Sequence, residues 1–394
     1  MPEAATLTAL QDAAAQRAQS LGLPTRRLES WHYTDLQKLL PLTSVDAPAR
    51  AVELPELFAP LDPLRLVFVD GCLQDLPMAL PEGLRIDKMG DNDVGHLDNY
   101  GDDGLLATNL ANFKDGVTVT VSTQVARPVE FVWACSSADK AAYGRVMLQV
   151  EKGAGLKVLE THQGTGLSHL AVEITLAENA QLEIVKTHLA DLEQAGITQT
   201  NCRLETGARL KTVLVGLQAR LARHENNIVF NGADAHAEIA SVLLASDNQH
   251  MDVTSCLDHR VADTTSETVA RTVLDQQARG VFQGKVIVRQ DAQRVDANQK
   301  SDALMLSRQA EMNAKPELEI YADDVACAHG SAIGEIDRDA IFFLRSRGLS
   351  LDEARHLLIS GFMAEIIERI SDDHIQAVLT GLIADKLVQV EGQA

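Results

Sequence analysis

The chain has 394 residues, of which 45% are hydrophobic but only 4% aromatic, so a sizeable core must be built mostly from aliphatic side chains. Its formal net charge of −21 and its pI near 4.9 would repel nucleic-acid phosphates and anionic membrane surfaces, which argues against both as partners. No run approaches the ~20 apolar residues that span a bilayer, and the N-terminal segment lacks the basic start and apolar stretch of a secretory signal.

The cysteines give no sign of a disulfide framework. There are five, none of them paired at CxxC spacing, at positions 72, 135, 202, 256 and 327. An odd, scattered set argues against disulfides and against a self-contained zinc or iron–sulfur site. We therefore expect a cytoplasmic protein in a reducing compartment.

The first forty residues carry a helical pattern. Apolar residues recur at Leu7, Leu10, Ala14 and Leu21, and Pro24 marks a stop. The segment ESWHYTDL that follows contains Trp31 and Tyr33. These are two of only six Trp and Tyr residues in the chain, so we expect them to pack.

The region before residue 116 also contains a short strand and a loop. LRLVFVDG, residues 64–71, reads as a strand ending in an Asp-Gly turn. The polar stretch rich in Gly and Asp from Asp91 to Gly104 reads as a surface loop.

Strand patterns replace helical ones from about residue 116 to about residue 335. Four segments there share a Gly or Asn, an Ala, a variable residue and then alternating apolar positions. They start 26, 28 and 25 residues apart: GAGLKV (153–158), NAQLEI (179–184), GARLKT (207–212) and GADAHA (232–237). A repeat of this length is typical of stacked coils, because one coil cannot bury its inward face alone.

The Gly or Asn that begins each repeat suits a corner with positive φ. We therefore predict a mainly β chain built as a parallel β-helix over about 116–335. An antiparallel sandwich is the alternative. It would explain the strands but not the shared spacing.

The repeat also brings two histidines together. His162 and His188 follow their repeat starts by the same offset, so they are expected on neighbouring rungs about 4.8 Å apart. A metal pair is conceivable there. We favour a surface ladder, because the later rungs offer Gly216 and Ser241 at this position.

The chain after Asp337 is helical again. Ser350 and Glu353 form a capping box for one helix, and Ser371 is expected to cap a second. The first helix shows an apolar stripe of Ala354, Leu358, Phe362 and Ile366, with Leu351, Leu357 and Ile370 beside it. A helical region this small has little core of its own. It must therefore pack on the rest of the chain or on a partner.

Residues 318–337, LEIYADDVACAHGSAIGEID, hold the main chemical candidates. Cys327 and His329 are two positions apart and share a strand face with Asp323, while Asp324 lies on the other face. Glu335 and Asp337 follow. A thiol and an imidazole could form a nucleophile–base pair or ligate iron or zinc.

Three interpretations of this motif stay open. Two metal ligands are only half a site, so the motif has no metal or shares one across an interface. Alternatively, Cys327 is a small hydrophobe and His329 a surface residue.

The sequence has no P-loop, no GxSxG elbow and no GxGxxG motif that follows a strand and opens a helix. A stand-alone metal-dependent enzyme on a β-helix is the alternative function.

Three stretches of the sequence resemble the SufB/SufD family of the SUF iron–sulfur cluster assembly system. They are ESWHYTDL (29–36), GVFQGKVIV with AQRVDANQ (280–299), and the run from PELEIYADDVACAHGSAIGEID through FFLRSRGLSLDEARHLLISGF (316–362). The CAHG run and the few cysteines favour the SufD side of the family. The resemblance implies an N-terminal helical and mixed region over 1–115, a right-handed parallel β-helix over 116–337 and a C-terminal helical domain over 338–394.

The resemblance also implies partners and site residues. It implies a non-enzymatic scaffold that pairs with SufB through the β-helix and binds the ATPase SufC through its C-terminal helices, with a homodimer possible when partners are absent. His329, with Cys327 beside it, would contact a nascent cluster at the SufB interface, exposed when ATP hydrolysis opens that interface. No cofactor would be held stably by this chain alone. Candidate SufC contacts are Phe343, Leu349, Leu358 and Phe362.

Overall fold

The structure is a computed structural model that describes residues 6–36, 54–77, 79–93 and 103–391. The helices of these ranges are α1 (Leu7–Leu21), α4 (Gly104–Asn112), α5 (Arg338–Ser346), α6 (Leu351–Ile367) and α7 (Asp373–Glu391), with 3-10 turns η1 (Glu29–Trp31), η2 (Ala59–Leu61) and η3 (Asp91–Asp93). The strands are β1 (Leu64–Val69), β2 (Cys72–Leu73), β3 (Leu84–Lys88), β4 (Gly116–Val121), β5 (Val129–Val150), β6 (Gly155–Leu176), β7 (Gln181–Leu189), β8 (Ala195–Leu204), β9 (Arg209–Gln218), β10 (Leu221–Phe230), β11 (His236–Ala245), β12 (His250–His259), β13 (Thr265–Leu274), β14 (Arg279–Val288), β15 (Val295–Met305), β16 (Glu311–Ile320) and β17 (Val325–Gly334).

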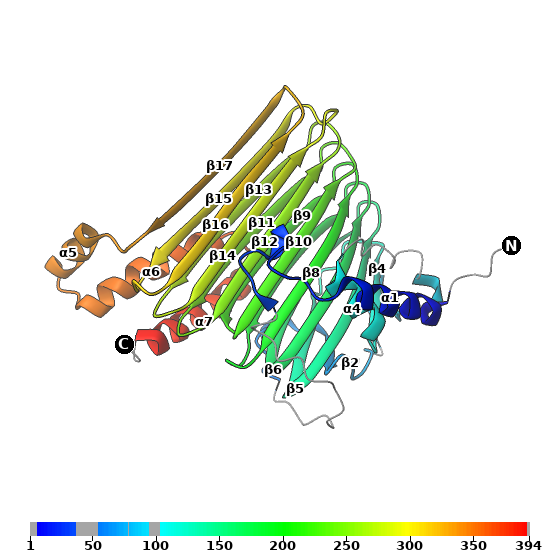
Figure 1. Cartoon of the computed structure of the whole chain (residues 1–394), viewed down its shortest axis with the longest axis horizontal. Coiled ribbons are helices and arrows are strands. Elements are labelled where there is room, and N and C mark those ends of the chain that lie inside the picture. Colours follow the sequence, from blue (N-terminus) through cyan, green and yellow to red (C-terminus); the bar gives the residue numbers. More distant parts are fainter. Residues whose placement is uncertain (1–5, 37–53, 78, 94–102, 392–394) are drawn as a thin grey trace.

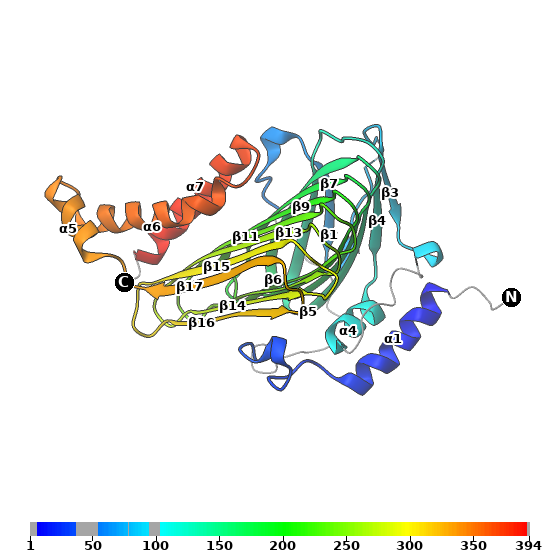
Figure 2. The same cartoon turned by 90° about the horizontal axis from the view of Figure 1, so that it is seen from above.

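The strands form two parallel walls of one coil. Wall A is the series β7, β9, β11, β13, β15 and β17, and wall B is the series β8, β10, β12, β14 and β16. The long strand β6 serves both walls, since its first half pairs with β7 and its second half with β8. The predicted mainly β parallel β-helix is therefore confirmed, and the antiparallel sandwich is excluded because neighbours within each wall run parallel (Figures 1 and 2).

The corners of the coil lie where the repeat predicted them, with one exception. Gly153, Asn179 and Gly207 have φ of 69°, 57° and 67°. In the fourth repeat the left-handed residue is Asp234, with φ of 60°, and not Gly232. The alignment slipped by two residues because GADAHA has alanine at both its second and fourth positions.

His162 and His188 do lie on neighbouring rungs. They are partners in the β6–β7 register, and their rings stack with centroids 4.9 Å apart and an interplanar angle of 4°. The surface-ladder interpretation is wrong, because both rings point into the coil and are at most 1% exposed. Gly216 follows His188 as predicted, but the next rung offers Leu243 and not Ser241, which is the same two-residue slip.

The interior of the coil is mostly aliphatic, as the low aromatic content requires. Rows of in-register residues such as Leu182 and Leu210 fill it. A rare aromatic contact joins Phe230 to the ring of His259, with centroids 4.0 Å apart. Burial lowers the pKa of His259 to about 4, and both of its ring nitrogens are hydrogen-bonded to hydroxyl groups, those of Thr264 and Ser266.

The N-terminal segment packs against the outer face of wall B. Helix α1 covers the predicted residues and ends at Leu21, with Gly22 as its C-cap. Trp31 is buried as expected, and the guanidinium carbon of Arg223 lies 4.0 Å from its ring centroid. Tyr33 is only half-buried. Thr34 bonds the carboxylate of Asp252 on the same wall.

The region from 64 to 112 departs in part from expectation. Strand β1 ends in an Asp-Gly turn, with positive φ at Asp70 and Gly71, and pairs with β5. The predicted loop over 91–104 lies partly outside the described residues. Helix α4 was not predicted, because its short apolar run shows little periodicity. The Asp103 carboxylate caps it.

Helices α6 and α7 pack on the outer face of wall A, as Figure 2 shows. The Ser350–Glu353 capping box is present. Ser371 does not cap α7, because the Asp372 carboxylate accepts the first N–H bonds. The buried face of α6 is displaced from the predicted apolar stripe. Ile359 and Met363 are buried, whereas the predicted Leu358 and Phe362 are half-buried.

The buried imidazole of His259 predicts acid sensitivity. Between pH 6.5 and 4 the unfolded chain binds a proton at this residue that the folded chain does not, so stability is complete above pH 6.5 and falls as the pH falls towards 4. We expect His259→Gln to reduce the loss of unfolding free energy between pH 7.5 and 5.0 by roughly 2 kcal/mol. Urea titrations at the two pH values measure this.

The matched control is His374→Gln, at an exposed residue of α7. This variant should lose as much stability at pH 5.0 as the parent chain. An equal pH dependence for His259→Gln and the parent would contradict the prediction.

Candidate functional site

The coil is open at the end formed by β16 and β17 (Figure 1). Strand β16 pairs with β14, and β17 pairs with β15. Within the described ranges no further strand pairs with the outer edge of either one. Their outward N–H and C=O groups are therefore available to a strand from another chain.

The two open edges differ in side chains. Strand β16 carries charged residues and Pro316, which has no N–H to donate, and such features discourage pairing. Strand β17, VACAHGSAIG, has no Asp, Glu, Lys, Arg or Pro and is mostly small residues. Strand β17 is thus the edge better suited to accept a partner strand.

The apolar interior is incompletely covered at this end. Leu318, Val325 and Cys327 pack against the aliphatic core but are only half-buried. Tyr321, which follows β16, and Ile333 of β17 are 60% and 52% exposed. A partner that capped the coil would remove this apolar surface from water, which is favourable.

Cys327 and His329 continue a column of inward-facing residues. Their partners in the β15–β17 register are Ala297 and Gln299, which are 0% and 3% exposed. Because register partners share a side of the sheet, Cys327 and His329 also face inward. Lying on the last rung, Cys327 is half-buried and His329 is exposed.

The neighbouring acidic residues do not join them. Asp323 and Asp324 precede β17 and are exposed. Glu335 lies 3.9 Å from Arg338, and Asp337 caps α5. In the part of the chain that the structure describes, no three or more His, Cys, Asp and Glu side chains form a group that could hold a metal ion.

The Cys327 side chain is held as a thiol. Burial raises the pKa of Cys327, a backbone hydrogen bond with Ala297 lowers it by less, and the Asp296 carboxylate adds a still smaller rise. The thiol form is a poor nucleophile. The geometry therefore does not favour a nucleophile–base pair with His329.

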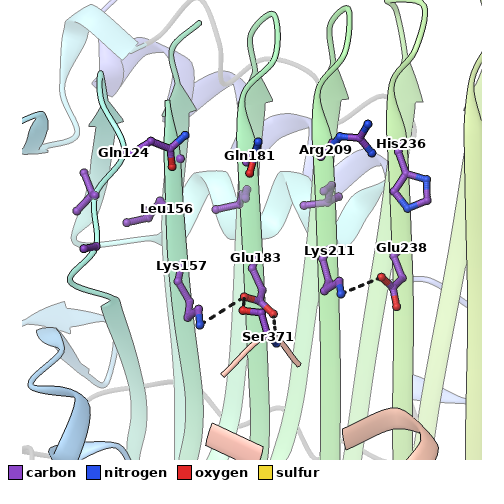
Figure 3. Close-up of a pocket in the computed structure, with 15 residues that line it drawn as sticks. Gln124, Leu156, Lys157, Gln181, Glu183, Arg209, Lys211, His236, Glu238 and Ser371 are labelled. Atoms are coloured by element: carbon purple, nitrogen blue, oxygen red, sulfur yellow. Dashed lines mark hydrogen bonds and ion pairs between the residues drawn. The ribbon is translucent and has the colours of Figure 1, made fainter. Parts of the chain in front are cut away.

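A groove of about 590 Å³ crosses wall A away from this end, over β6, β7, β9 and β11 (Figure 3). Four of its charged side chains form two ion pairs. Lys157 lies 3.6 Å from Glu183, and Lys211 lies 3.1 Å from Glu238. Ser371 from the α6–α7 turn bonds Glu183, so these ladders anchor the helices to the wall.

The C-terminal helices expose apolar side chains. Of the predicted partner contacts, Phe343 is 54% exposed, whereas Leu349, Leu358 and Phe362 are half-buried. Three further exposed apolar residues, Phe342, Leu351 and Leu357, were not among the predicted contacts. We call the set Phe342, Phe343, Leu351 and Leu357 the α5–α6 surface. The consecutive phenylalanines of α5 were the signal, since a nine-residue helix cannot bury both.

The fold and its open end define the class of protein. It is a parallel β-helix with helices on its outer faces and one end left uncovered. Across the described ranges, no helix has both the length and the apolar content to cross a membrane.

Comparison with known proteins gives the family. Residues 133–362 match the family described as SUF system FeS cluster assembly, SufBD core domain. This match covers more than half of the chain, so the chain belongs to the SufBD family of iron–sulfur cluster assembly proteins. The resemblance expected from the ESWHYTDL and CAHG stretches is thereby confirmed.

Known proteins are similar to this chain over most of its length. The iron–sulfur cluster assembly protein SufD of Escherichia coli is 28% identical over 382 residues, covering 93% of this chain and 90% of its own. A SufBD family protein of Synechocystis is 28% identical, with 95% and 90% covered. The chloroplastic protein ABCI7 of Arabidopsis thaliana is 26% identical, with 94% and 84% covered.

The raised pKa of Cys327 predicts slow alkylation. At pH 7.5 we expect iodoacetamide to modify Cys327 several-fold more slowly than free glutathione, because less of it is thiolate. The rate should rise steeply above pH 9. Peptide mass spectrometry over a time course measures both, and modification faster than that of glutathione would show an activated thiol instead.

Proposed function

We propose that this chain is a non-catalytic scaffold subunit that pairs with SufB through the open end of its β-helix. The observation that carries the proposal is the uncovered last rung, where an inward-facing column ends in the exposed His329. A homologous β-helix could cap this end, because it would offer matching strand edges and its own apolar interior.

His329 gains a chemical role in such a pair. In the free chain its imidazole is exposed on the last rung, because in the described ranges no further strand covers it. Capping would enclose it between two chains, where thiolates from the partner could complete a ligand set for a nascent iron–sulfur cluster. This explains why the chain has only half of a site. Cys327 lies on the same strand, is half-buried against the core, and is a weaker ligand while protonated.

The cluster would be transient and would belong to the complex. A neutral imidazole suits iron, but one imidazole and one protonated thiol cannot hold a cluster. We therefore propose no cofactor bound stably by this chain alone. The odd number of cysteines and the lack of any pair at CxxC spacing fit a cytoplasmic location.

The α5–α6 surface is the proposed dock for the ATPase SufC. Its aromatic side chains are exposed although the helix that follows is anchored on wall A. Exposed apolar groups of this kind, rimmed by polar residues, are typical of protein interaction sites. ATP hydrolysis at that dock could move the helices relative to wall A, and this movement could change the structure at the capped end.

The function of His329 is tested by substitution. We expect His329→Ala to fold and to form the complex with SufB and SufC, but to lower cluster maturation in cells by about tenfold or more, the scale seen when the surroundings of a metal site are disturbed. Activity of a cluster-dependent reporter enzyme gives the measurement, and co-purification gives the complex.

Ser331→Ala is the matched control, since Ser331 is on the same strand and the same side and is also exposed. It should mature clusters normally. Normal maturation by His329→Ala, or substrate turnover by the isolated chain, would refute the scaffold proposal.

The proposed SufC dock makes a separate prediction. The double substitution Phe342→Ser and Phe343→Ser should weaken SufC binding by tenfold or more, because exposed aromatic anchors dominate interface energies. It should leave the melting temperature and SufB pairing unchanged, since neither side chain is buried. Calorimetry with purified SufC measures the affinity. Unchanged binding would show that SufC does not bind the α5–α6 surface.

A further inference from the structure

A pocket of about 400 Å³ lies where the coil meets the C-terminal helices. The β15–β16 turn, the segment that leads from β17 into α5, and the start of α6 line it (Figure 1). We call it the junction pocket. Its apolar lining includes Met305 and Leu306 from the turn and Ile336 before α5. An apolar lining with a few polar groups is typical of binding pockets.

The polar groups of the junction pocket are mainly cationic. Three of the described side chains that line it are arginines: Arg308 from the turn, Arg338 from α5 and Arg355 from α6. Among the described lining residues only Glu335 carries a carboxylate, and it lies 3.9 Å from Arg338. The pocket is therefore positive, although the whole chain has a formal net charge of −21.

Arg355 needs an acceptor that the described chain does not supply. Its side chain is half-buried, and its Nε atom is buried without a hydrogen-bond partner. A guanidinium that is partly removed from water without a partner is destabilising. A carboxylate is the matching acceptor, because its two oxygens accept from two parallel N–H groups of an arginine.

The two helices place these side chains on shared faces. Leu351 and Arg355 are four residues apart on α6, and both line the pocket. Arg338 and Ile341 are three residues apart on α5, and both line it as well. Residues at these spacings are neighbours on a helix surface. Each helix thus presents one apolar side chain and one guanidinium to the pocket.

The junction pocket is continuous with the α5–α6 surface, because Leu351 belongs to both. Ile341 lies next to Phe342 in α5. A further guanidinium, that of Arg347, has its carbon 4.5 Å from the ring centroid of the exposed Phe343. A protein that covers the exposed phenylalanines would therefore also reach the arginines of the pocket.

We propose that the ATPase SufC, bound at the α5–α6 surface, places an acidic side chain in the junction pocket, where its carboxylate pairs with Arg355. This contact rests on the proposed SufC dock and adds to it a charge that selects the partner. A protein that covers the pocket without offering a carboxylate would leave the guanidinium enclosed and unpaired, which is unfavourable.

Other anions suit the junction pocket less well. A nucleic acid or an anionic membrane would bring many negative charges to a chain of net charge −21, and most of them would be repelled. A single acidic side chain interacts mainly with the pocket itself. A small anion would leave the neighbouring phenylalanines in water, whereas a docked protein would bury them.

The first test compares affinities for purified SufC by calorimetry. Arg355→Gln in the full chain should weaken binding by about tenfold or more, because it leaves the carboxylate of SufC enclosed without its cation. Arg355→Lys should weaken it less, since it keeps the charge but not the two parallel N–H groups. Melting temperatures show whether the variants fold. Arg308→Gln, at an exposed turn residue, should also weaken binding and keeps the test open if Arg355→Gln does not fold.

The matched control for these affinities is Arg220→Gln. Arg220 is exposed between β9 and β10 and does not line the junction pocket. This variant should bind SufC as the parent chain does.

The second test identifies the group that pairs with position 355. A carbodiimide joins an amine to a carboxylate in contact with it, so the chain with Arg355→Lys is treated with this reagent in the presence of SufC. Peptide mass spectrometry should find an amide bond from position 355 to an Asp or Glu of SufC. A chain with Arg220→Lys should form no such bond at position 220.

The outcomes separate this contact from the dock itself. Weaker binding by the Phe342→Ser and Phe343→Ser chain, with unchanged binding by Arg355→Gln and Arg308→Gln, would keep the dock and refute the acidic contact. Unchanged binding by all of these variants would refute both. A cross-link from position 355 that reaches only Glu335 of the same chain would overturn the acidic contact. So would binding of inorganic phosphate or ATP to the free chain that Arg355→Gln abolishes while SufC binding is unchanged.

Discussion

The structure depends on one constraint, which is that a coil of parallel strands must end. Every inner strand finds hydrogen-bond partners on both sides, but the last strand of each wall finds them on one side only. The same rung leaves Leu318 and Val325 half-covered. The unpaired strand edge and the half-covered apolar core thus coincide. His329 lies where the docking of a second protein would bury the most apolar surface and pair the open edge.

The sequence predicted the coil well because its signal is repetitive. Gly153, Asn179 and Gly207 occupy corners with positive φ, and few residues tolerate that conformation, so the pattern is visible without structure. The prediction weakened at Asp234, where an aspartate takes the same conformation and a nearby Gly-Ala pair imitates the repeat. Helix α4 was missed because only its Asp103 cap and a brief apolar run mark it.

The candidate site was predictable in part. The Cys-x-His spacing fixed a common face for Cys327 and His329, and their inward partners agree with this. The exposure of His329 could not be predicted, because it depends on β17 being the last strand of its wall. The stacked histidines inside the coil show the same limit. The sequence aligned His162 with His188, but whether a rung position points inward or outward is a property of the closed coil.

The two ends of the coil differ in a way that controls assembly size. The starting end finishes in short strands, β2 with two residues and β3 with five, and β3 carries an exposed ion pair between Arg85 and Asp87. Such edges resist strand addition. A rod with one receptive tip and one blunt tip cannot grow head to tail into a fibre. A second coil added at the open edge would therefore end strand addition, and a β-rich protein with an open edge would remain a discrete particle.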